Sequence, residues 1–200
     1  MNCFKKIPPP CFSSLSVVIL AGGQGKRMGA RQKALLPYQG KPLLSWVIQG
    51  LAEKQLPVLL NVNSQDSAYQ SYDLPQFSDQ YQGFLGPLAG MQAAWDNVAS
   101  DWIVFVPCDN PSLPNHLIER LLQSYFIHPA PLVAVHDGKR VQPLYLLMHR
   151  SMKPALERAL EQSHLSVSRW IQENSHVLAD FSDQPQFFQN INTINTLESS

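Results

Sequence analysis

The strongest constraint on the fold is a continuous apolar run, SVVIL at positions 16–20, which ends at a cluster of glycines. A strand with one face in water alternates apolar and polar residues. A continuous β-branched run is instead typical of a strand that is buried on both faces. Such a strand needs helices on both sides of its sheet. The run therefore predicts a central parallel strand of an α/β protein.

Strand and helix patterns alternate along the rest of the chain. Apolar runs predict further strands at 58–63, 76–79, 102–109, 131–135 and 141–148, and short closing strands at 176–181 and 187–192. Apolar periodicity and start signals predict helices that begin with Pro42 as first residue, at Gly86, and over 115–126, 151–162 and 165–173. This order predicts a Rossmann-like three-layer α/β/α sandwich with a mostly parallel sheet and right-handed crossovers.

The length of the chain sets the number of domains. Two hundred residues, of which 44% are hydrophobic, can bury one sizeable core but not two ordinary ones. We therefore expect a single domain over residues 16–200. Residues 1–15, which include three consecutive prolines, are expected to form a disordered leader.

The balance of charges and the spacing of the cysteines exclude several classes of partner and site. Fifteen basic residues balance fifteen acidic ones, so no long-range field attracts nucleic acid or an anionic membrane, and we expect neither as a partner. Cys3, Cys11 and Cys108 are too scattered for a metal-ligand pair or a disulfide framework, which favours a reducing compartment. No apolar run reaches the ~18 residues that span a bilayer. We expect a soluble, cytoplasmic protein that captures its ligands locally.

A glycine-rich loop follows the predicted central strand. Its sequence is LAGGQGKRMGARQK, at positions 20–33, and ligands of open α/β sheets gather where such loops lie, at the carboxyl ends of the strands. Gly22 and Gly23 allow the backbone to approach a ligand, so that successive N–H groups can converge on phosphate oxygens. Arg27 and Lys33 supply matching positive charge. The segment predicts a phosphate-binding loop rather than a simple turn.

Two common phosphate-binding motifs do not fit the spacing of this loop. In a dinucleotide fingerprint that starts at Gly23, the third glycine would fall at Met28. In a P-loop, the glycine five positions after Gly22 or Gly23 would fall at Arg27 or Met28. The loop therefore belongs to neither class.

Asp109 is the candidate metal ligand. It ends the predicted strand at 102–109, and it should therefore reach the same edge of the sheet as the glycine-rich loop. Magnesium takes one or two protein carboxylates and completes its octahedron with phosphate oxygens and water, so one aspartate can suffice. The alternative is that Asp109 caps the helix that follows.

Three segments together resemble a known family. LAGG at 20–23, followed by Arg27, Met28, Gly29 and Lys33, is similar to the opening signature of the molybdenum cofactor guanylyltransferases, the MobA family. GPLAG at 86–90 resembles the second glycine motif of that family, and NINT at 190–193 resembles its closing motif. The chain departs from the family at Gln32, where the family has aspartate, and at Ile194, where it has proline.

The resemblance implies a nucleotide-diphospho-sugar transferase-like fold and a definite reaction. A guanylyltransferase of this family moves GMP from GTP to the terminal phosphate of molybdopterin (Mo-molybdopterin), forms the guanine dinucleotide cofactor and releases pyrophosphate. Its implied cofactor is Mg²⁺, and its implied partners are GTP, molybdopterin, cofactor insertion proteins and apo-molybdoenzymes.

The same resemblance assigns roles to individual residues of this chain. The catalytic residues would be Arg27, Lys33 and Asp109, with Asp109 holding the metal. Nucleotide binding would involve Leu20, Ala21, Gly22, Gly23, Lys33, Asn61, Asp79, Gly86, Gly90 and Asp109. Asn190 and Asn192 would contact the pterin.

Other functions stay open at this point. A cytidylyltransferase that acts on the same pterin, or a sugar-phosphate nucleotidyltransferase, would have a similar fold, although LAGG instead of LAAG and the NINT segment favour GTP. A non-catalytic carrier of nucleotide or cofactor would fit the departures at Gln32 and Ile194. The presence of Arg27, Lys33 and Asp109 argues against that last alternative.

Overall fold

A seven-stranded sheet forms the centre of the protein. The computed structural model describes residues 7–23, 32–81, 83 and 85–188. The strand order is β5-β4-β1-β6-β8-β7-β9. The strands are β1 (Leu15–Leu20), β4 (Val58–Asn61), β5 (Gln76–Phe77), β6 (Trp102–Pro107), β7 (Leu132–His136), β8 (Val141–His149) and β9 (Val177–Asp180). Only β8 pairs antiparallel with its neighbours β6 and β7, and the other pairs are parallel, which confirms the predicted mostly parallel sheet.

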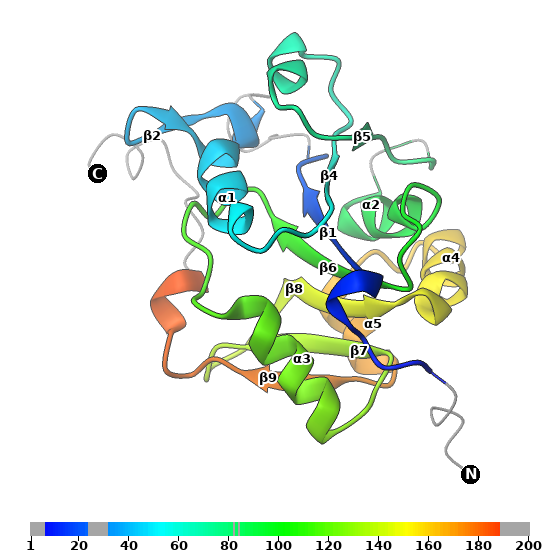
Figure 1. Ribbon diagram of the computed structural model, residues 1–200. Helices are drawn as coiled ribbons and strands as arrows, with labels where there is room; N and C mark the ends of the chain where they lie inside the picture. The colour runs from blue at the N-terminus through cyan, green and yellow to red at the C-terminus, as the bar shows by residue number, and fades with distance from the viewer. Residues whose placement is uncertain (1–6, 24–31, 82, 84, 189–200) are drawn as a thin grey trace.

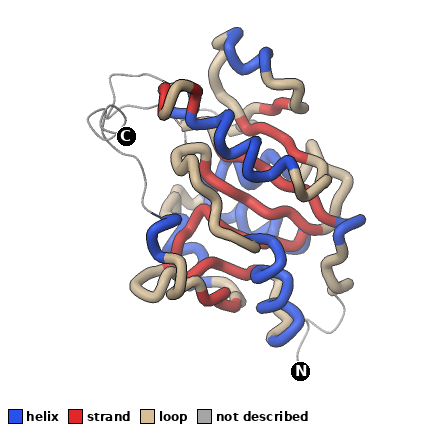
Figure 2. Tube along the Cα trace, turned by 60° about the vertical axis from the view of Figure 1, so that its left-hand side comes forward, coloured by secondary structure: helices blue, strands red, loops and turns tan. Residues whose placement is uncertain are grey.

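Helices cover both faces of this sheet (Figures 1 and 2). They are α1 (Leu43–Ala52), α2 (Pro87–Ala94), α3 (Leu117–Ile127), α4 (Lys153–Glu161) and α5 (Val167–Glu173). The buried residues of α3 and all those of α1 except Leu43 belong to one apolar cluster, and the buried apolar residues of α2, α4 and α5 belong to another on the opposite face. The predicted three layers are therefore confirmed. None of the helices in the described part of the chain has the length and apolar character needed to cross a membrane.

The central strand β1 shows why its sequence is apolar from Val17 to Leu20. Val17 and Ile19 pack into the cluster under α1 and α3, whereas Val18 and Leu20 pack into the cluster under α2. Successive side chains of a strand point to opposite faces, so a strand between two helical layers needs apolar residues at every position. All six residues of β1 are buried. The prediction from SVVIL is confirmed.

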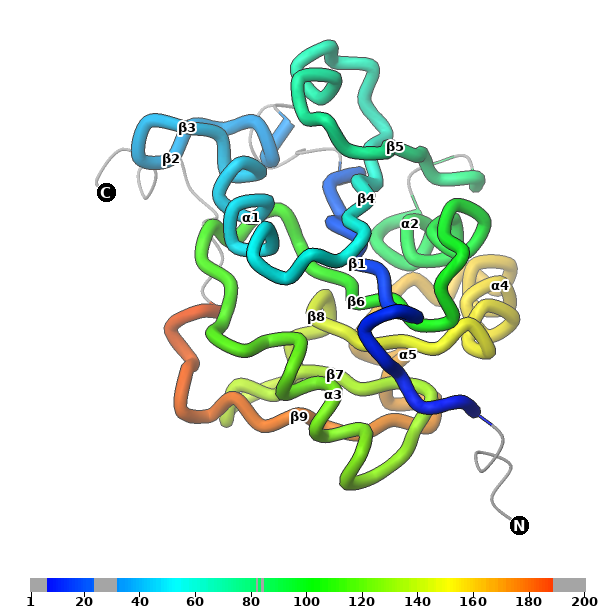
Figure 3. The backbone as a smooth tube through the Cα atoms, viewed as in Figure 1, coloured from blue at the N-terminus to red at the C-terminus, as the bar shows by residue number. Residues whose placement is uncertain are grey.

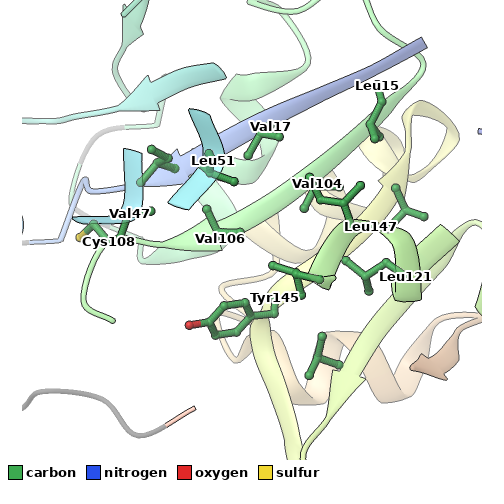
Figure 4. Close-up of a cluster of buried hydrophobic side chains, with 14 of the residues drawn as sticks. Leu15, Val17, Val47, Leu51, Val104, Val106, Cys108, Leu121, Tyr145 and Leu147 are labelled. Atoms are coloured by element: carbon green, nitrogen blue, oxygen red, sulfur yellow. The ribbon is translucent and has the colours of Figure 1, made fainter. Parts of the chain in front are cut away.

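Helix α1 covers the sheet with the face that its periodicity predicts. Figure 4 shows Val47 and Leu51 of α1 beside Val17 of β1 and Val106 of β6. These side chains are at most 3% exposed. Burial of an aliphatic side chain of this kind stabilises a fold by about 1.5–3 kcal/mol. Packing of this face therefore holds α1 on the sheet next to the strand ends that carry the site.

A small hairpin was not predicted from the sequence. Strands β2 (Pro37–Tyr38) and β3 (Lys41–Pro42) pair antiparallel around Gln39 and Gly40, whose φ angles are 47° and 81°. Two consecutive positive φ values are the geometry of a type I′ hairpin turn. Strands this short carry no periodic signal. Because Pro42 ends β3, it is the N-cap of α1 and not the first helical residue that we predicted.

The C-terminal part of the predicted order also differs. The expected strand at 187–192 begins instead within a 3-10 helix, η7 (Pro185–Phe188), and its remaining residues lie outside the described part of the chain. Phe188 is buried and packs edge to face against Tyr145 and Phe181. The aromatic residues that suggested a strand thus anchor a turn of 3-10 helix on the core.

Part of the predicted leader contacts the body of the protein. The indole Nε1 of the buried Trp102 donates a hydrogen bond to the Pro8 carbonyl oxygen over 3.0 Å, and Phe12–Ser14 form a 3-10 helix, η2, directly before β1. Residues 1–6 lie outside the described part, so a disordered leader stays a prediction for them.

Arg150 holds the segment between α2 and β6, and its loss should destabilise the fold. Its guanidinium donates hydrogen bonds to the carbonyl oxygens of Trp95, Val98 and Ser100, over 2.8–2.9 Å. Hydrogen bonds to charged groups contribute about 1.5–3 kcal/mol each, less where water can replace them. We therefore expect Arg150→Met to lower the free energy of unfolding by about 2 kcal/mol, measured by urea denaturation.

Arg169→Met is the matched control for this experiment. Arg169 forms an exposed i,i+4 ion pair with Glu173, and such pairs contribute about 0.5 kcal/mol or less. Equal losses of stability in the two variants would contradict the structural role of Arg150.

Candidate active site

The ends of three parallel strands form the floor of a cavity of about 430 Å³. Leu20 at the end of β1 pairs with Asn61 at the end of β4 on one side and with Pro107 at the end of β6 on the other. Figure 3 shows these three strands side by side. Because parallel strands end at the same edge of a sheet, the loops that follow them meet there. The cavity lies where the sequence predicts ligand binding.

The structure brings most of the predicted site residues to this cavity. Its lining includes Leu20, Ala21, Gly22, Gly23, Lys33, Asn61, Asp79, Gly86 and Asp109. Gly90 does not line it. Arg27, Asn190 and Asn192 lie outside the described part of the chain. Nine residues chosen from four separate segments of the sequence thus converge on one cavity.

Lys33 and Asp109 form an ion pair at one side of the cavity. Lys33 begins a 3-10 helix, η4 (Lys33–Leu35), and Asp109 lies two residues beyond β6. Lys33 Nζ donates to Asp109 Oδ2 over 3.0 Å, and the two side chains are 20% and 19% exposed. Asp109 Oδ1 is buried and has no hydrogen-bond partner among the residues that the structure describes. One carboxylate oxygen is therefore held by the ammonium, and the other is available to a cation.

A network of two amides and one carboxylate lies beyond the end of β4, which is on the other side of β1 from β6. Asn61 Nδ2 donates to Asp79 Oδ1 over 2.9 Å, and Asn63 Nδ2 donates to Asp79 Oδ2 over 2.7 Å. Asn63 Nδ2 also donates to the carbonyl oxygen of Gly22 over 3.0 Å. Both oxygens of Asp79 are thus engaged, which fixes the orientation of this carboxylate.

Two of the predicted glycines are required by close packing. A Cβ atom at Gly22 would lie 2.7 Å from Asn63 Nδ2 and 2.9 Å from Asn61 Oδ1. A Cβ atom at Gly90, inside α2, would overlap Asn61 Oδ1 and lie 3.2 Å from a methyl group of Leu20. Gly90 therefore lets α2 pack closely against Asn61 and Leu20 at the strand ends, and it acts on the site through this packing. Gly86 is different, since it caps α2 with a φ of 79° and lines the cavity itself.

An irregularity in β8 completes the cavity wall. Ala134 of β7 pairs with Leu146, but the next residue, Val135, pairs with Gln142, so residues 143–145 have no partner in β7. A bulge of this kind redirects side chains at the edge of a sheet. Leu144 lines the cavity, and Tyr145 packs on the opposite side in the core. Pro143, which has no backbone N–H, lies among these unpaired residues, and proline inside a strand is typical of a bulge, but our prediction was an unbroken strand over 141–148.

Sequence reasoning missed several other residues of the site. The cavity is also lined by Ala34, Pro87, Pro107, Cys108 and Leu144. Asn63 was missed as well, although it follows Asn61 by two positions. Side chains two positions apart in an extended chain point to the same side, so this spacing could have identified it.

Cys108 contributes an apolar wall rather than a nucleophile. Burial raises the pKa of its thiol to about 12, and the neighbouring Asp109 carboxylate acts in the same direction. The thiolate is the nucleophilic form of cysteine, so the group is unreactive at neutral pH. Burial, together with the Asp109 carboxylate, also raises the pKa of Tyr145. Neither group is poised to take up or release a proton near neutral pH.

The geometry suits an anionic ligand together with a cation. Lys33 and the backbone of Gly22 and Gly23 face the cavity, as does the Asp109 carboxylate. Within residues 7–23, 32–81, 83 and 85–188 there is no cluster of three or more acidic, histidine or cysteine side chains that could hold a metal ion. A metal ion here would need ligand oxygens in addition to Asp109, as magnesium bound to a nucleotide has.

Two relatives that are similar to this chain over nine-tenths of its length carry the same name. A "Molybdenum cofactor guanylyltransferase" from Aliivibrio salmonicida is 39% identical over 181 residues, which cover 90% of this chain and 92% of that protein. A protein of the same name from Shewanella pealeana is 35% identical over 181 residues, which cover 90% of each chain.

Solved structures share the fold at lower sequence identity. Molybdopterin-guanine dinucleotide biosynthesis protein A from Archaeoglobus fulgidus is 22% identical, with a TM-score of 0.76 over 92% of this chain and 95% of that one. A CMP:2-keto-3-deoxy-manno-octonic acid synthetase in complex with CTP is 14% identical, with a TM-score of 0.70 over 93% and 96% of the two chains. These similarities confirm the nucleotide-diphospho-sugar transferase-like fold.

The family match covers most of the chain. The family described as "MobA-like NTP transferase domain" matches residues 17–177, from β1 to the start of β9, and so includes every described residue of the cavity. This match, together with the relatives in Aliivibrio and Shewanella, shows that the chain belongs to the family of MobA-like NTP transferase domains.

Proposed function

We propose that the protein transfers GMP from GTP to the terminal phosphate of molybdopterin (Mo-molybdopterin), which yields the guanine dinucleotide cofactor and pyrophosphate. The relatives named molybdenum cofactor guanylyltransferase, which match nine-tenths of the chain at 35% and 39% identity, support this reaction. One observation carries it: the glycine-rich loop, Lys33 and Asp109 meet at a single cavity of about 430 Å³.

The chemistry is a nucleotidyl transfer without a covalent enzyme intermediate. An oxygen of the pterin phosphate attacks the α-phosphorus of GTP, a new P–O bond forms, and the bond to the β-phosphate breaks so that pyrophosphate leaves. Such transfers depend mainly on positioning and on neutralisation of charge. Lys33 and Arg27 supply positive charge for the phosphate oxygens, and backbone amides of Gly22 and Gly23 donate to them. The neutral thiol of Cys108 takes no part.

Asp109 fits the role of metal ligand in this reaction. Its Oδ1 is buried without a hydrogen-bond partner in the described part of the chain, while Lys33 holds Oδ2 over 3.0 Å. Mg²⁺ would be held by this oxygen, with phosphate oxygens and water completing its coordination. When bound, the ion supplies neutralisation of charge on the phosphate oxygens. Lys33 keeps the carboxylate directed toward the cavity.

Different residues around the cavity are proposed to bind the two substrates, GTP and the pterin. Asn61, Asp79 and Gly86 line the cavity, and β1 separates the end of β4, which carries Asn61, from the end of β6, which precedes Asp109. These three residues would contact the base and ribose of GTP. On the other side, Asn110 donates through Nδ2 to the carbonyl oxygen of Phe187, which ties the last described segment to the residue after Asp109. Asn190 and Asn192 follow that segment in the sequence and would contact the pterin.

The product defines the later partners. A finished guanine dinucleotide cofactor has to pass to cofactor insertion proteins and apo-molybdoenzymes, and we propose these as partners. We propose that the protein, its substrates and the recipients of its product are cytoplasmic.

Nucleotide selection can be tested by thermal shift. A ligand that binds only the folded protein raises its melting temperature, and a concentration of 100 times Kd corresponds to about 2.7 kcal/mol. We expect GTP with Mg²⁺ to raise the Tm more than ATP, CTP or UTP at equal concentration. A larger shift with CTP would favour a cytidylyltransferase and contradict the proposed substrate.

Replacement of Asp109 should abolish transfer without unfolding the protein. Asp109→Asn keeps the shape of the side chain but removes the charge that holds Mg²⁺ and pairs with Lys33. We expect the rate of pyrophosphate release with GTP and Mo-molybdopterin to fall by at least about 100-fold, because electrostatic stabilisation of the transferring group contributes several kcal/mol.

Asp101→Asn is the control for the Asp109 variant. Asp101 is an exposed aspartate near the opposite end of β6, where its carboxylate lies 3.8 Å from Arg150. Its replacement should leave the transfer rate unchanged. Near-normal transfer by Asp109→Asn in magnesium would remove Asp109 from the proposed mechanism.

The packing role of Gly90 predicts an indirect effect on GTP binding. In Gly90→Ala the new methyl group would overlap Asn61 Oδ1, so Asn61 has to move and its bond to Asp79 is disturbed. We expect GTP affinity to fall roughly tenfold, the effect of one lost hydrogen bond to a charged group, measured by calorimetric titration.

Gly50→Ala provides a matched control inside another helix. A Cβ atom there would lie 3.3 Å from a methyl group of Leu113, a flexible side chain remote from the cavity lining. Alanine favours a helix over glycine by about 1 kcal/mol, so this variant should fold well and bind GTP normally. Unchanged affinity in Gly90→Ala would contradict the proposed dependence of the site on α2 packing.

A further inference from the structure

We propose that Asn63 is a positioning residue, which orients the peptide between Gly22 and Gly23 so that the Gly23 amide is a fixed donor for a phosphate oxygen of the nucleotide. This inference rests on the proposed binding of GTP. Asn63 itself is not part of the cavity lining, whereas Gly22 and Gly23 both are. It therefore acts through the backbone that it holds.

The side chain of Asn63 is fully used in this arrangement. Its Nδ2 donates to the Gly22 carbonyl oxygen over 3.0 Å and to Asp79 Oδ2 over 2.7 Å, which engages both amide protons. Its Oδ1 accepts a hydrogen bond from the backbone N–H of Asp79 over 2.9 Å. An asparagine offers these donors and acceptors in one plane, whereas an aspartate offers no donor. The residue type matches all three contacts.

The bond to Gly22 determines where the next amide points. A trans peptide unit is planar, and its C=O and N–H groups point in opposite directions. Because the Gly22 carbonyl is directed toward Asn63, the Gly23 N–H is directed away from Asn63. A backbone donor that is fixed before the ligand arrives needs no reorganisation on binding, and its hydrogen bond to an anionic oxygen is charge-assisted.

The same contacts couple the two sides of the nucleotide site. Asp79 is held by Asn61 at one oxygen and by Asn63 at the other, while Asn63 also holds the glycine-rich loop. Gly22 has to be glycine for this, since a Cβ atom would lie 2.7 Å from Asn63 Nδ2. The position of the loop is thereby set by the segment after β4 and not by the loop residues alone.

Calorimetric titration of Asn63→Ala with two ligands tests the proposal. GTP carries phosphates and guanosine does not, so a fixed phosphate donor affects GTP alone. Loss of the contacts with Asp79 acts on both ligands, whereas loss of the contact with Gly22 acts on the phosphate donor alone. We therefore expect the affinity for GTP to fall roughly tenfold to a hundredfold more than the affinity for guanosine, as for one charge-assisted hydrogen bond. An equal loss for both ligands would show a merely structural role and overturn the proposal, as would unchanged GTP affinity.

Asn174→Ala is the matched control. Asn174 also donates through Nδ2 to a backbone carbonyl, that of Trp170 over 2.7 Å, but at the end of α5, outside the cavity lining. The Asn174→Ala variant should lose the stability of one hydrogen bond and keep its affinity for GTP. An affinity loss equal to that of Asn63→Ala would overturn the proposal.

A measurement on the unaltered protein keeps the test open if Asn63→Ala does not fold. The chain has ten glycines, so selective ¹⁵N-glycine labelling gives a simple NMR spectrum. The Gly23 amide resonance should shift on addition of GTP and not on addition of guanosine. If GTP binds and this resonance does not move, the inference is wrong while the proposed function stands. If the unaltered protein binds no GTP, the proposed function itself fails.

Discussion

The parallel pairing of β1 with β4 and β6 is the constraint on which the rest of the structure depends. It places Leu20, Asn61 and Pro107 side by side, so that the segments that follow three distant strands begin at the same edge of the sheet. These strands are largely buried on both faces, which is why they are mostly apolar and why polar residues gather where they end. The sharp change from apolar to polar residues at each strand end is thus what makes the site.

Charge in the site is arranged in local pairs rather than as a field. The chain has equal numbers of acidic and basic residues, so attraction of a nucleotide has to come from groups close to it. Lys33 is paired with Asp109, and Asp79 is held by two neutral amides. A partly buried pair of this kind is screened less by salt than a surface pair. Binding of a metal–nucleotide complex can then replace internal contacts by new ones without a large change in net charge.

Sequence patterns predicted the layers and most of the site, because strong periodicity and strand-end positions are local signals. The segments SVVIL and WIVFVP predicted the central strands β1 and β6. Residues that directly follow these strands, such as Gly22 after β1 and Asp109 after β6, line the cavity. The β2–β3 hairpin left no such signal, because two-residue strands have no period. The bulge that brings Leu144 to the cavity depends on pairing with β7 and is marked in the sequence only by Pro143. Gly90 was assigned to ligand contact because its motif resembles a family motif, whereas its packing against Asn61 is a tertiary contact.

Gln32, where the resemblance to the family predicts an aspartate, is consistent with this local arrangement of charges. Gln32 immediately precedes Lys33, and its Oε1 accepts a hydrogen bond from the Tyr69 hydroxyl over 3.4 Å. Tyr69 is buried, and that burial raises the pKa of its hydroxyl, so the group stays a neutral donor. An aspartate at this position would add a negative charge at the residue before Lys33. Glutamine keeps an acceptor for Tyr69 and adds no charge there, next in sequence to the lysine that pairs with Asp109.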